Sequence, residues 1–372
     1  MKLIILKTNL KEGLDSVGRV AGDGASALPI LKNFLFETVD GKIKLSATNL
    51  ELAITCFVSG KIIEDGGITI PLGIFNSIIG NLQSERISLE TENDNLVIKT
   101  DNYEAKIQGI KKEEFPIIPS MANGVASMDI DLESVRGAFS FVVGAAQVSE
   151  LRPEMNGVLF DFGTNMVKLA ATDSFRLAEM TISDSRFKTE ISEPFRIIIP
   201  LKTINEVVRI FKGVGEKITI QFDNNQILFR DGNLEMISRL VSGDFPEYQP
   251  IIPQDAETEV VLDKNELVNA LKLASSFTDR LNEVKFSAGD KSKSVEVFSS
   301  SHNLGENKYL IPAKAKGSSV EVVFNWRFFL DGLKSFNSEN VKIGLNGDDK
   351  PAIIKSPNDN SCFYILMPIK NS

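Results

Sequence analysis

The chain has 372 residues, of which 42% are hydrophobic and 24% charged, and this composition indicates a soluble globular protein of two or three domains. Its 41 basic and 50 acidic residues give a net charge of −9, which argues against a protein that coats nucleic acid by charge. The apolar run in the opening MKLIILKTNLKEG is too short for the core of a signal peptide. No run approaches the ~20 apolar residues of a membrane-spanning helix.

One pattern of predicted elements occurs three times along the chain. ITIPLGIFNSIIGNL, IIIPLKTINEVVRIF and VVFNWRFFLDGLKSF each predict a short strand and then a helix that opens at Pro71, Pro200 or Asn325. A further helix pattern opens each third of the chain, and an alternating hairpin pattern follows each strand–helix stretch. In chain order, helices are expected near residues 10–17, 71–82, 132–142, 200–211, 263–274 and 325–336.

Two of these helices have the spacing of a capping box, Asn9 with Glu12 and Asp263 with Glu266. Pro-rich connectors, EEFPIIPSMANG and GDFPEYQPIIPQDAE, end the first and second thirds. The chain is therefore expected to hold three repeated α+β domains of about 124 residues, each with two helices packed on antiparallel sheets. The expected domains are residues 1–125, 126–255 and 256–372.

The residue types needed for common catalytic and metal sites are scarce. His302 is the single histidine and lies in a polar stretch, so His-based metal clusters and Ser-His-Asp catalysis are excluded. Cys56 and Cys362 lie in apolar, strand-like stretches, and two buried, reduced thiols fit the cytoplasm. We therefore predict no enzyme activity, no metal and no cofactor, which leaves binding, assembly or topology as the function.

One short sequence segment occurs twice in the chain, with different residues in its middle. KLSATNLELAI in the first third returns as KLAATDSFRLAEM in the second. We interpret the second copy as carrying one additional residue, so that Ser174-Phe175-Arg176 stands in place of Leu50-Glu51. The shared part then belongs to the fold, and the altered part is a candidate for function.

Four motifs in order give the chain an end-to-end resemblance to a known family. LPILKNFLFE, ATDSFRLAE, the two connectors EEFPIIP and GDFPEYQPIIP, and the ending YILMPIK resemble the bacterial DNA polymerase III beta subunit, the sliding clamp. The resemblance implies a head-to-tail homodimer that forms a closed six-domain ring around duplex DNA, with helices lining the hole. It implies a processivity factor that holds DNA topologically and without sequence preference.

The same resemblance implies a set of partners and a place for them. The partners are the replicative polymerase alpha subunit, the clamp loader, repair polymerases and other proteins with a clamp-binding motif, with no membrane involved. Their short peptides are expected in a hydrophobic cleft between the second and third domains. Carried over by position, the cleft residues are Arg152, Met155, Thr172, Ser174, Phe175, Arg176, Leu177, Pro246, Ile251, Ile365, Leu366, Met367, Pro368 and Ile369.

The resemblance also implies DNA-facing and dimer-forming residues. The DNA-facing candidates on helical polar faces are Lys11, Arg19, Arg136, Lys202, Arg209, Lys212, Lys264 and Lys272. The dimer-interface candidates are Ala105, Ile107 and Phe277. The chain departs from the family at two DNA-contact spots, since Gly24-Ala25-Ser26 replaces a loop that usually holds arginine, and Pro153-Glu154 replaces aromatic residues.

Other interpretations of these residues stay open at this point. Phe175 and Leu177 fit an ordinary core between domains, and Met367 fits the last residue of an edge strand. The whole chain also fits a monomeric three-domain interaction scaffold that forms no ring. An enzyme whose site is not visible in the sequence is the third alternative.

Overall fold

The computed structural model describes residues 1–21, 28–121, 125–146, 149, 151–163, 165–212, 216–289 and 293–370. Each of the six helices expected from the apolar spacing is present at its place. Within the described residues, no helix is long and apolar enough to cross a membrane. The helices are α1 (Lys7–Val17), α2 (Leu72–Asn81), α3 (Leu132–Val142), α4 (Leu201–Ile210), α5 (Lys264–Ala274) and α6 (Trp326–Ser335).

The contacts divide the chain into two compact units. The first unit holds residues 1–132, 187–191 and 206–240, and the second holds the other described residues. The central third of the chain is therefore shared between the units, because one part of it continues a sheet with the first third and another part with the last.

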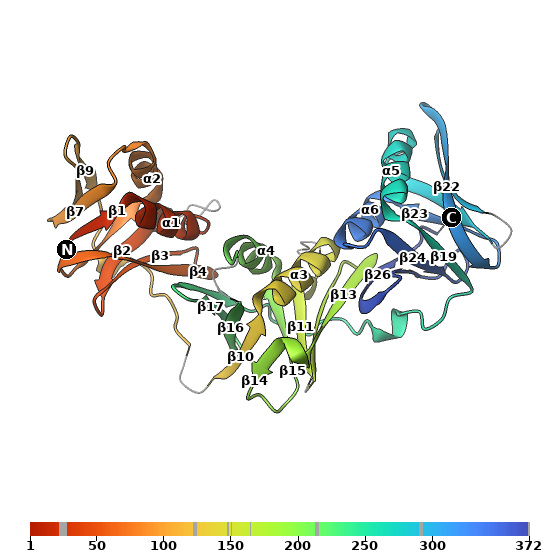
Figure 1. Ribbon diagram of the computed structural model, residues 1–372, viewed down its shortest axis with the longest axis horizontal. Coiled ribbons are helices and arrows are strands. Elements are labelled where there is room, and N and C mark those ends of the chain that lie inside the picture. The colour runs from red at the N-terminus through yellow and green to blue at the C-terminus, as the bar shows by residue number, and fades with distance from the viewer. Residues whose placement is uncertain are drawn as a thin grey trace. The chain divides into compact units, whose positions relative to one another are not determined.

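The first unit contains a five-stranded and a nine-stranded sheet. Their strand orders are β5-β1-β7-β8-β9 and β14-β10-β16-β17-β18-β4-β3-β2-β6. Helices α1 and α2 lie next to each other against these strands (Figure 1). The strands are β1 (Lys2–Leu6), β2 (Asn33–Val39), β3 (Lys42–Thr48), β4 (Leu52–Val58), β5 (Gly60–Glu64), β6 (Gly67–Pro71), β7 (Arg86–Glu92), β8 (Asn95–Lys99), β9 (Glu104–Gln108), β10 (Ala126–Asp131), β14 (Phe187–Thr189), β16 (Lys217–Phe222), β17 (Gln226–Asp231) and β18 (Leu234–Arg239).

The second unit contains one twelve-stranded sheet. Its order is β15-β11-β12-β13-β26-β25-β24-β19-β22-β21-β20-β23. Helices α5 and α6 lie next to each other in this unit (Figure 1). The strands are β11 (Gly157–Gly163), β12 (Met166–Thr172), β13 (Arg176–Ser183), β15 (Phe195–Pro200), β19 (Thr258–Asp263), β20 (Glu283–Ala288), β21 (Ser294–Ser301), β22 (Gly305–Gly317), β23 (Val320–Asn325), β24 (Asn340–Leu345), β25 (Ala352–Ser356) and β26 (Asp359–Leu366).

The repeated sequence pattern produces the same succession of elements in each third. A strand leads directly into a helix in β6–α2, β15–α4 and β23–α6, and the hairpins β7–β8, β16–β17 and β24–β25 follow, as the alternation predicted. Half of the capping box at Asp263 is present: its carboxylate accepts a hydrogen bond from the Glu266 backbone N–H at 2.8 Å, whereas the Glu266 carboxylate accepts from the Tyr309 hydroxyl at 2.9 Å. The one at Asn9 is wrong: β1 runs straight into α1, which begins at Lys7 with Leu6 as an N-cap that makes no side-chain bond.

Two strand pairs join the thirds of the chain. In the first junction, β4 pairs with β18, and Leu52 lies opposite Ser238. In the second junction, β13 pairs with β26, and Arg176 lies opposite Leu366. Both pairs are antiparallel and in the same register relative to the repeats, so the two junctions share one plan.

A glycine in α6 marks how closely this helix lies on the sheet of the second unit. A Cβ on Gly332 would meet the buried Tyr364 ring at 2.5 Å, a distance that real Cβ contacts do not show. We expect Gly332→Ala to cost about 1–3 kcal/mol in overpacking, more than the ~1 kcal/mol that alanine gains over glycine in a helix. Urea denaturation followed by the fluorescence of Trp326 measures the loss.

Gly137 in α3 is the matched control, because a Cβ there has no neighbour within 4 Å. Gly137→Ala should stabilise the protein by up to about 1 kcal/mol. Equal effects of the two substitutions would show that the contact with Tyr364 relaxes without cost.

Candidate functional site

The turn between β12 and β13 is held by its own side chains. The Thr172 hydroxyl donates to the Arg176 carbonyl at 2.7 Å, and one Asp173 carboxylate oxygen accepts from the backbone N–H groups of Phe175 and Arg176, both at 3.0 Å. Ser174 has a φ of 75°, in the left-handed region. These bonds fix the turn tightly enough to leave the Phe175 side chain 59% exposed.

The turn between β3 and β4 in the first third is built the same way. The Thr48 hydroxyl donates to the Leu52 carbonyl at 3.1 Å, and the Asn49 side-chain oxygen accepts from the backbone N–H groups of Glu51 and Leu52 at 3.1 and 2.9 Å. Leu50 has a φ of 77°, as Ser174 has 75°. Each of these three bonds therefore has its counterpart in the other turn.

This equality overturns the interpretation that the second copy carries an additional residue. Thr48 lies opposite Ala53, and Thr172 lies opposite Leu177, so both turns have the same length. The shared Leu-Ala letters are one position out of structural register, because Ala53 occupies the place of Leu177. After the shared threonine the two turns differ in four side chains: Asn49, Leu50, Glu51 and Leu52 in the first, and Asp173, Ser174, Phe175 and Arg176 in the second.

Arg176 ties this turn to helix α6. Its guanidinium is paired with Asp173 at 2.9 Å and with Asp331 of α6 at 2.7 Å, and it lies 4.4 Å from the centre of the Phe328 ring. Burial alone lowers the pKa of the Arg176 guanidinium, but Tyr364, Asp331 and Asp173 outweigh it and the pKa lies above its ordinary value. The side chain is therefore a permanent charge, buried and doubly paired.

An aromatic wall and the chain's tail lie beside this ion pair. The Phe175 ring stacks on Phe328, with ring centres 6.3 Å apart and planes at 25°. The Met367 backbone N–H donates to the Phe175 carbonyl at 2.9 Å, and the Ile369 N–H donates to the Val323 carbonyl at 2.8 Å. The structure thus brings Phe175 next to the segment after β26, and an exposed aromatic ring stands beside it. We call Phe175, Phe328 and Met367–Ile369 the groove, after the cleft that the family resemblance implies.

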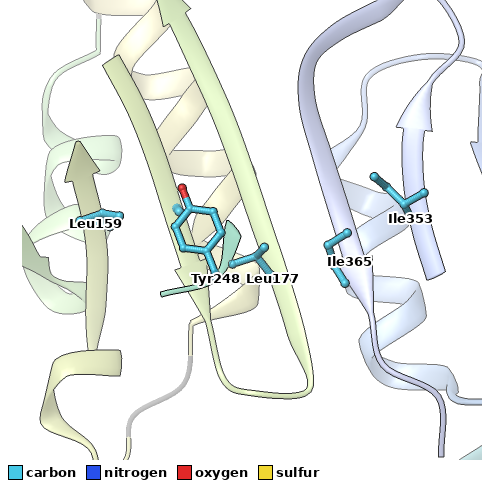
Figure 2. Close-up of a cluster of buried hydrophobic side chains, with 6 residues drawn as sticks. Leu159, Leu177, Tyr248, Ile353 and Ile365 are labelled. Carbon is cyan, nitrogen blue, oxygen red and sulfur yellow. The ribbon is translucent and has the colours of Figure 1, made fainter. Parts of the chain in front are cut away.

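Several residues expected on the walls of the cleft lie beneath its surface. Leu177, Ile365 and Leu366 are 0% exposed, because the β13–β26 pair turns them into the core. Figure 2 shows Leu177 and Ile365 in one buried cluster with Tyr248 and Ile353. The alternative that Leu177 is ordinary core between repeats is therefore correct for this residue, whereas Phe175 is exposed.

Tyr248 closes this cluster from the connector. Its hydroxyl donates to Glu179 at 2.6 Å, and its ring is 5% exposed. Burial first, and then the neighbouring Glu179 carboxylate, raise the pKa of Tyr248 above its ordinary value. The hydroxyl therefore stays protonated and keeps this bond.

The other cleft candidates are distributed around the turn and the connector. Met155 is buried, and its sulfur accepts from the Ser174 hydroxyl at 3.7 Å. Thr172 is also buried, Arg152 and Ile251 are exposed, and Pro246, Met367, Pro368 and Ile369 are partly buried.

The sequence interpretation missed Phe328 and Asp331. The available signal was Arg176 itself, since an arginine within an apolar strand is buried only when an acid pairs with it.

Half of the DNA-facing candidates gather in the first unit. Lys11 of α1 and Arg19, two residues beyond the end of α1, line a hollow of about 700 Å³ together with Arg209 and Lys212, which lie at and just beyond the end of α4. Glu12, Asp15 and Asp231 line the same hollow, so its charge is mixed and only weakly positive.

The candidates in the second unit are less uniform. The Lys264 ammonium donates to the Phe336 carbonyl at 2.7 Å, at the end of α6, so part of its hydrogen-bonding capacity is used within the protein. Arg136 is 3.6 Å from Glu133, and Lys202 and Lys272 are exposed. The loop at Gly24–Ser26 lies outside the described residues, whereas Pro153-Glu154 opens a short 3-10 helix, Pro153–Met155.

The dimer candidates lie on β9 and after α5. Strand β9 is at the edge of the five-stranded sheet, and it alternates so that Ala105 and Ile107 face inward. Ile107 is 4% exposed and belongs to the core, so its side chain offers no surface to a second copy. Phe277 ends the short helix Ser275–Phe277 and is partly buried.

Comparisons with known proteins cover the whole chain. Residues 1–119, 129–247 and 249–370 match the N-terminal, central and C-terminal domains of the DNA polymerase III beta subunit. The beta sliding clamps of Chlamydia muridarum and Bacillus subtilis are 27% and 26% identical, over 100% of this chain and 99% and 100% of theirs. The sliding clamp of Bacillus subtilis and the beta subunit of Thermotoga maritima superpose with TM-scores of 0.93 and 0.90 at 25% identity, each over 100% of both chains.

Proposed function

Because the chain belongs to the DNA polymerase III beta-subunit family, the sliding clamps, we propose that two copies close into a ring around duplex DNA and tether the replicative polymerase to it. One observation carries the proposal: all three domain types of the family follow one another in this chain, in the family's order. The function is that of a DNA sliding clamp, a processivity factor. No finding favours the monomeric scaffold over it.

The ring follows from three repeats and from the edge strands. Three repeats per chain make six in a head-to-tail dimer, with two identical heterologous contacts that close the ring. The outer edge of β9 has unpaired backbone groups in the described sheet order and is the natural place for a strand of the second copy. Since Ile107 faces the core, we propose that backbone pairing along β9 and the partly exposed Phe277 supply this contact.

The net charge of −9 fits a ring that encloses DNA better than a surface that binds DNA by charge. The hollow lined by Lys11, Arg19, Arg209 and Lys212 also carries three acids, and such mixed charge attracts a phosphate backbone only weakly. We propose that these side chains face the duplex and allow it to slide through the ring.

We also propose that the three domains of the chain are residues 1–125, 126–255 and 256–372.

The groove is proposed as the binding site for partner peptides of the polymerase alpha subunit, the clamp loader and repair polymerases. Its support is the exposed Phe175 ring, which stacks on Phe328, together with the backbone hydrogen bond from Met367 to the Phe175 carbonyl. We also propose that the protein is not an enzyme, needs no cofactor and works in the cytoplasm. The buried, free Cys56 and Cys362 fit that compartment, and burial raises the pKa of each thiol to about 11.

Retention on closed and cut DNA tests the function directly. The full chain is assembled on nicked circular duplex, separated from free protein and then challenged with a restriction enzyme. We expect it to stay on the circles and to leave when they are cut, because a ring slides off a free end. Binding to a short linear duplex should be weak and should fall further as salt rises.

Light scattering of the same sample supplies the second measurement, with a mass expected near twice 40.9 kDa. Equal retention on cut and uncut DNA, or tight binding to a short linear duplex at physiological salt, would contradict the topological link. A monomer at micromolar concentration would support the scaffold instead.

A further inference from the structure

The two junctions differ on one face of their sheets. At the second junction, the connector residue Tyr248 belongs to one buried cluster with Leu177, Ile353 and Ile365, and Figure 2 shows its ring beside Leu177. Its hydroxyl is satisfied by Glu179. Here the chain supplies its own aromatic side chain to cover the strands that join two repeats.

The first junction has the same three-strand arrangement of apolar side chains, with one of the three smaller. Ala53 lies opposite Ile237, which in turn lies opposite Leu228. Leu177 lies opposite Ile365, which lies opposite Ile353, in the matching register. Ala53 therefore stands where Leu177 stands, and its side chain has three carbon atoms fewer. We call the side chains of Ala53, Ile237 and Leu228 the floor of the first junction.

The connector of the first junction also supplies a smaller side chain. Aligning the Phe-Pro of EEFPII with the Phe-Pro of GDFPEY puts Ile118 in the place of Tyr248. Ile118 packs on the cluster of Ala53, Leu228 and Ile237, but it is only partly buried. An isoleucine over an alanine replaces a tyrosine over a leucine, so the cover is thinner on both sides.

A hollow of about 530 Å³ remains at this place. Ala53, Thr55, Leu228, Ile237 and Ile118 line it, with other residues of the strands and the connector. It lies on the sheet face away from α1, since Gly13 of that helix packs against Leu45 and Cys56, which point to the other side. Its size is within the roughly 300–1,000 Å³ of sites that bind small ligands.

The rim of the hollow carries more positive than negative charge. Lys42, Lys44 and Arg230 line it against Asp40 and Glu235. Lys44 is paired with Glu37 at 3.3 Å and Arg230 with Glu235 at 2.8 Å. The Lys42 ammonium lies 5.7 Å from the centre of the Phe57 ring and has no carboxylate within ion-pair distance among the described residues. It is therefore available to a carboxylate that enters with a ligand.

We propose that this hollow binds a tyrosine side chain of a partner peptide, with a carboxylate next to that tyrosine placed near Lys42. The chain's own Tyr248 shows that an aromatic ring with a hydroxyl fits the matching place at the second junction. Thr55 lines the hollow in the position of Glu179, and its hydroxyl, which shares a hydrogen bond with Ser46 at 3.1 Å, has capacity for a second bond to the phenol. The site is separate from the groove and does not depend on the ring or on DNA.

N-acetyl-L-tyrosine is the probe, titrated against the full chain by ligand-observed NMR. We expect saturable binding with a Kd on the order of 1 mM, as usual for a ligand of this size. N-acetyl-L-leucine should bind more weakly, because it lacks the ring and the hydroxyl. Lys42→Gln should weaken binding of N-acetyl-L-tyrosine and leave that of N-acetyl-L-tyrosinamide unchanged.

The decisive variant gives the first junction the tyrosine that the second junction has. Ile118→Tyr should fill the hollow from the connector and raise the melting temperature. It should also weaken binding of N-acetyl-L-tyrosine about ten-fold or more, and ten-fold is a loss of about 1.4 kcal/mol. Ile117→Tyr is the matched control, since Ile117 is the neighbouring residue and 95% exposed, and it should leave binding unchanged. Ala53→Leu, which copies Leu177, gives a second way to fill the floor. Absence of saturable binding to the wild-type chain, or equal binding by the filled variants, would overturn the proposal.

Discussion

Replacing Arg176 with alanine is expected to remove about 3 kcal/mol from the free energy of unfolding of the second unit. The guanidinium is 9% exposed and holds two carboxylates, and the Asp173 side chain is 2% exposed. Without Arg176, the Asp173 carboxylate stays buried with no opposite charge, and the link from β13 to Asp331 of α6 is gone. Urea denaturation followed by the fluorescence of Trp326, at the start of α6, measures the loss.

Arg196 gives a matched control, because it also joins two acids. It lies 3.1 Å from Asp161 and 3.0 Å from Glu247, but its side chain is 54% exposed. Exposed ion pairs contribute about 0–1 kcal/mol, so Arg196→Ala should change stability by less than about 1 kcal/mol. Similar losses in the two variants would show that burial of Arg176 does not matter.

Replacing Phe175 with alanine should weaken partner-peptide binding about ten-fold or more. A large apolar side chain of the peptide gains about 1.5–3 kcal/mol when fully buried, and the Phe175 ring supplies much of the apolar surface that would cover it. A loss of ~1.4 kcal/mol corresponds to a factor of ten in Kd. Fluorescence anisotropy with a labelled polymerase-tail peptide measures this, and light scattering should show an unchanged dimer.

The twin turn supplies the control for Phe175. Leu50 is an apolar side chain, 51% exposed, on the matching turn of the first third, where Glu51 replaces the aromatic ring. Leu50→Ala should leave the peptide affinity unchanged. If both variants bind like the wild type, the groove is not the partner site; if both lose affinity, the peptide contacts both turns.

The local elements of this fold were predictable because each depends on nearby residues. The apolar spacing after Pro71, Pro200 and Asn325 placed α2, α4 and α6 correctly, and the alternation around Asn and Asp placed the hairpins. The start of α1 was predicted wrongly, because β1 enters the helix without a break and a packed strand replaces the cap. Pairing between distant strands, such as β4 with β18, depends on tertiary contacts that no local pattern reports.

The sequence predicted which residues of the site come together, but not which of them are buried. The sequence indicated that Phe175 and Met367 come together, and a backbone hydrogen bond joins them. It did not separate surface from core: Leu177 and Ile365 alternate inward with the register of β13 and β26, and Ile107 does so on β9. Matching letters also suggested an extra residue in the second turn, because identity favoured Leu-Ala over the true register of Ala53 with Leu177.

The pairing of β13 with β26 has a consequence for the newborn chain. Arg176 meets Leu366 only after the intervening residues, about half of the chain, have been synthesised. At about 5–20 residues per second, the edge of β13 stays open for about 10–40 s on the ribosome. During that time a hydrophobic strand edge is exposed to other nascent chains. Strand β26 closes this edge when it pairs with β13, so the segment that leads into the groove also covers a strand edge that is prone to aggregation.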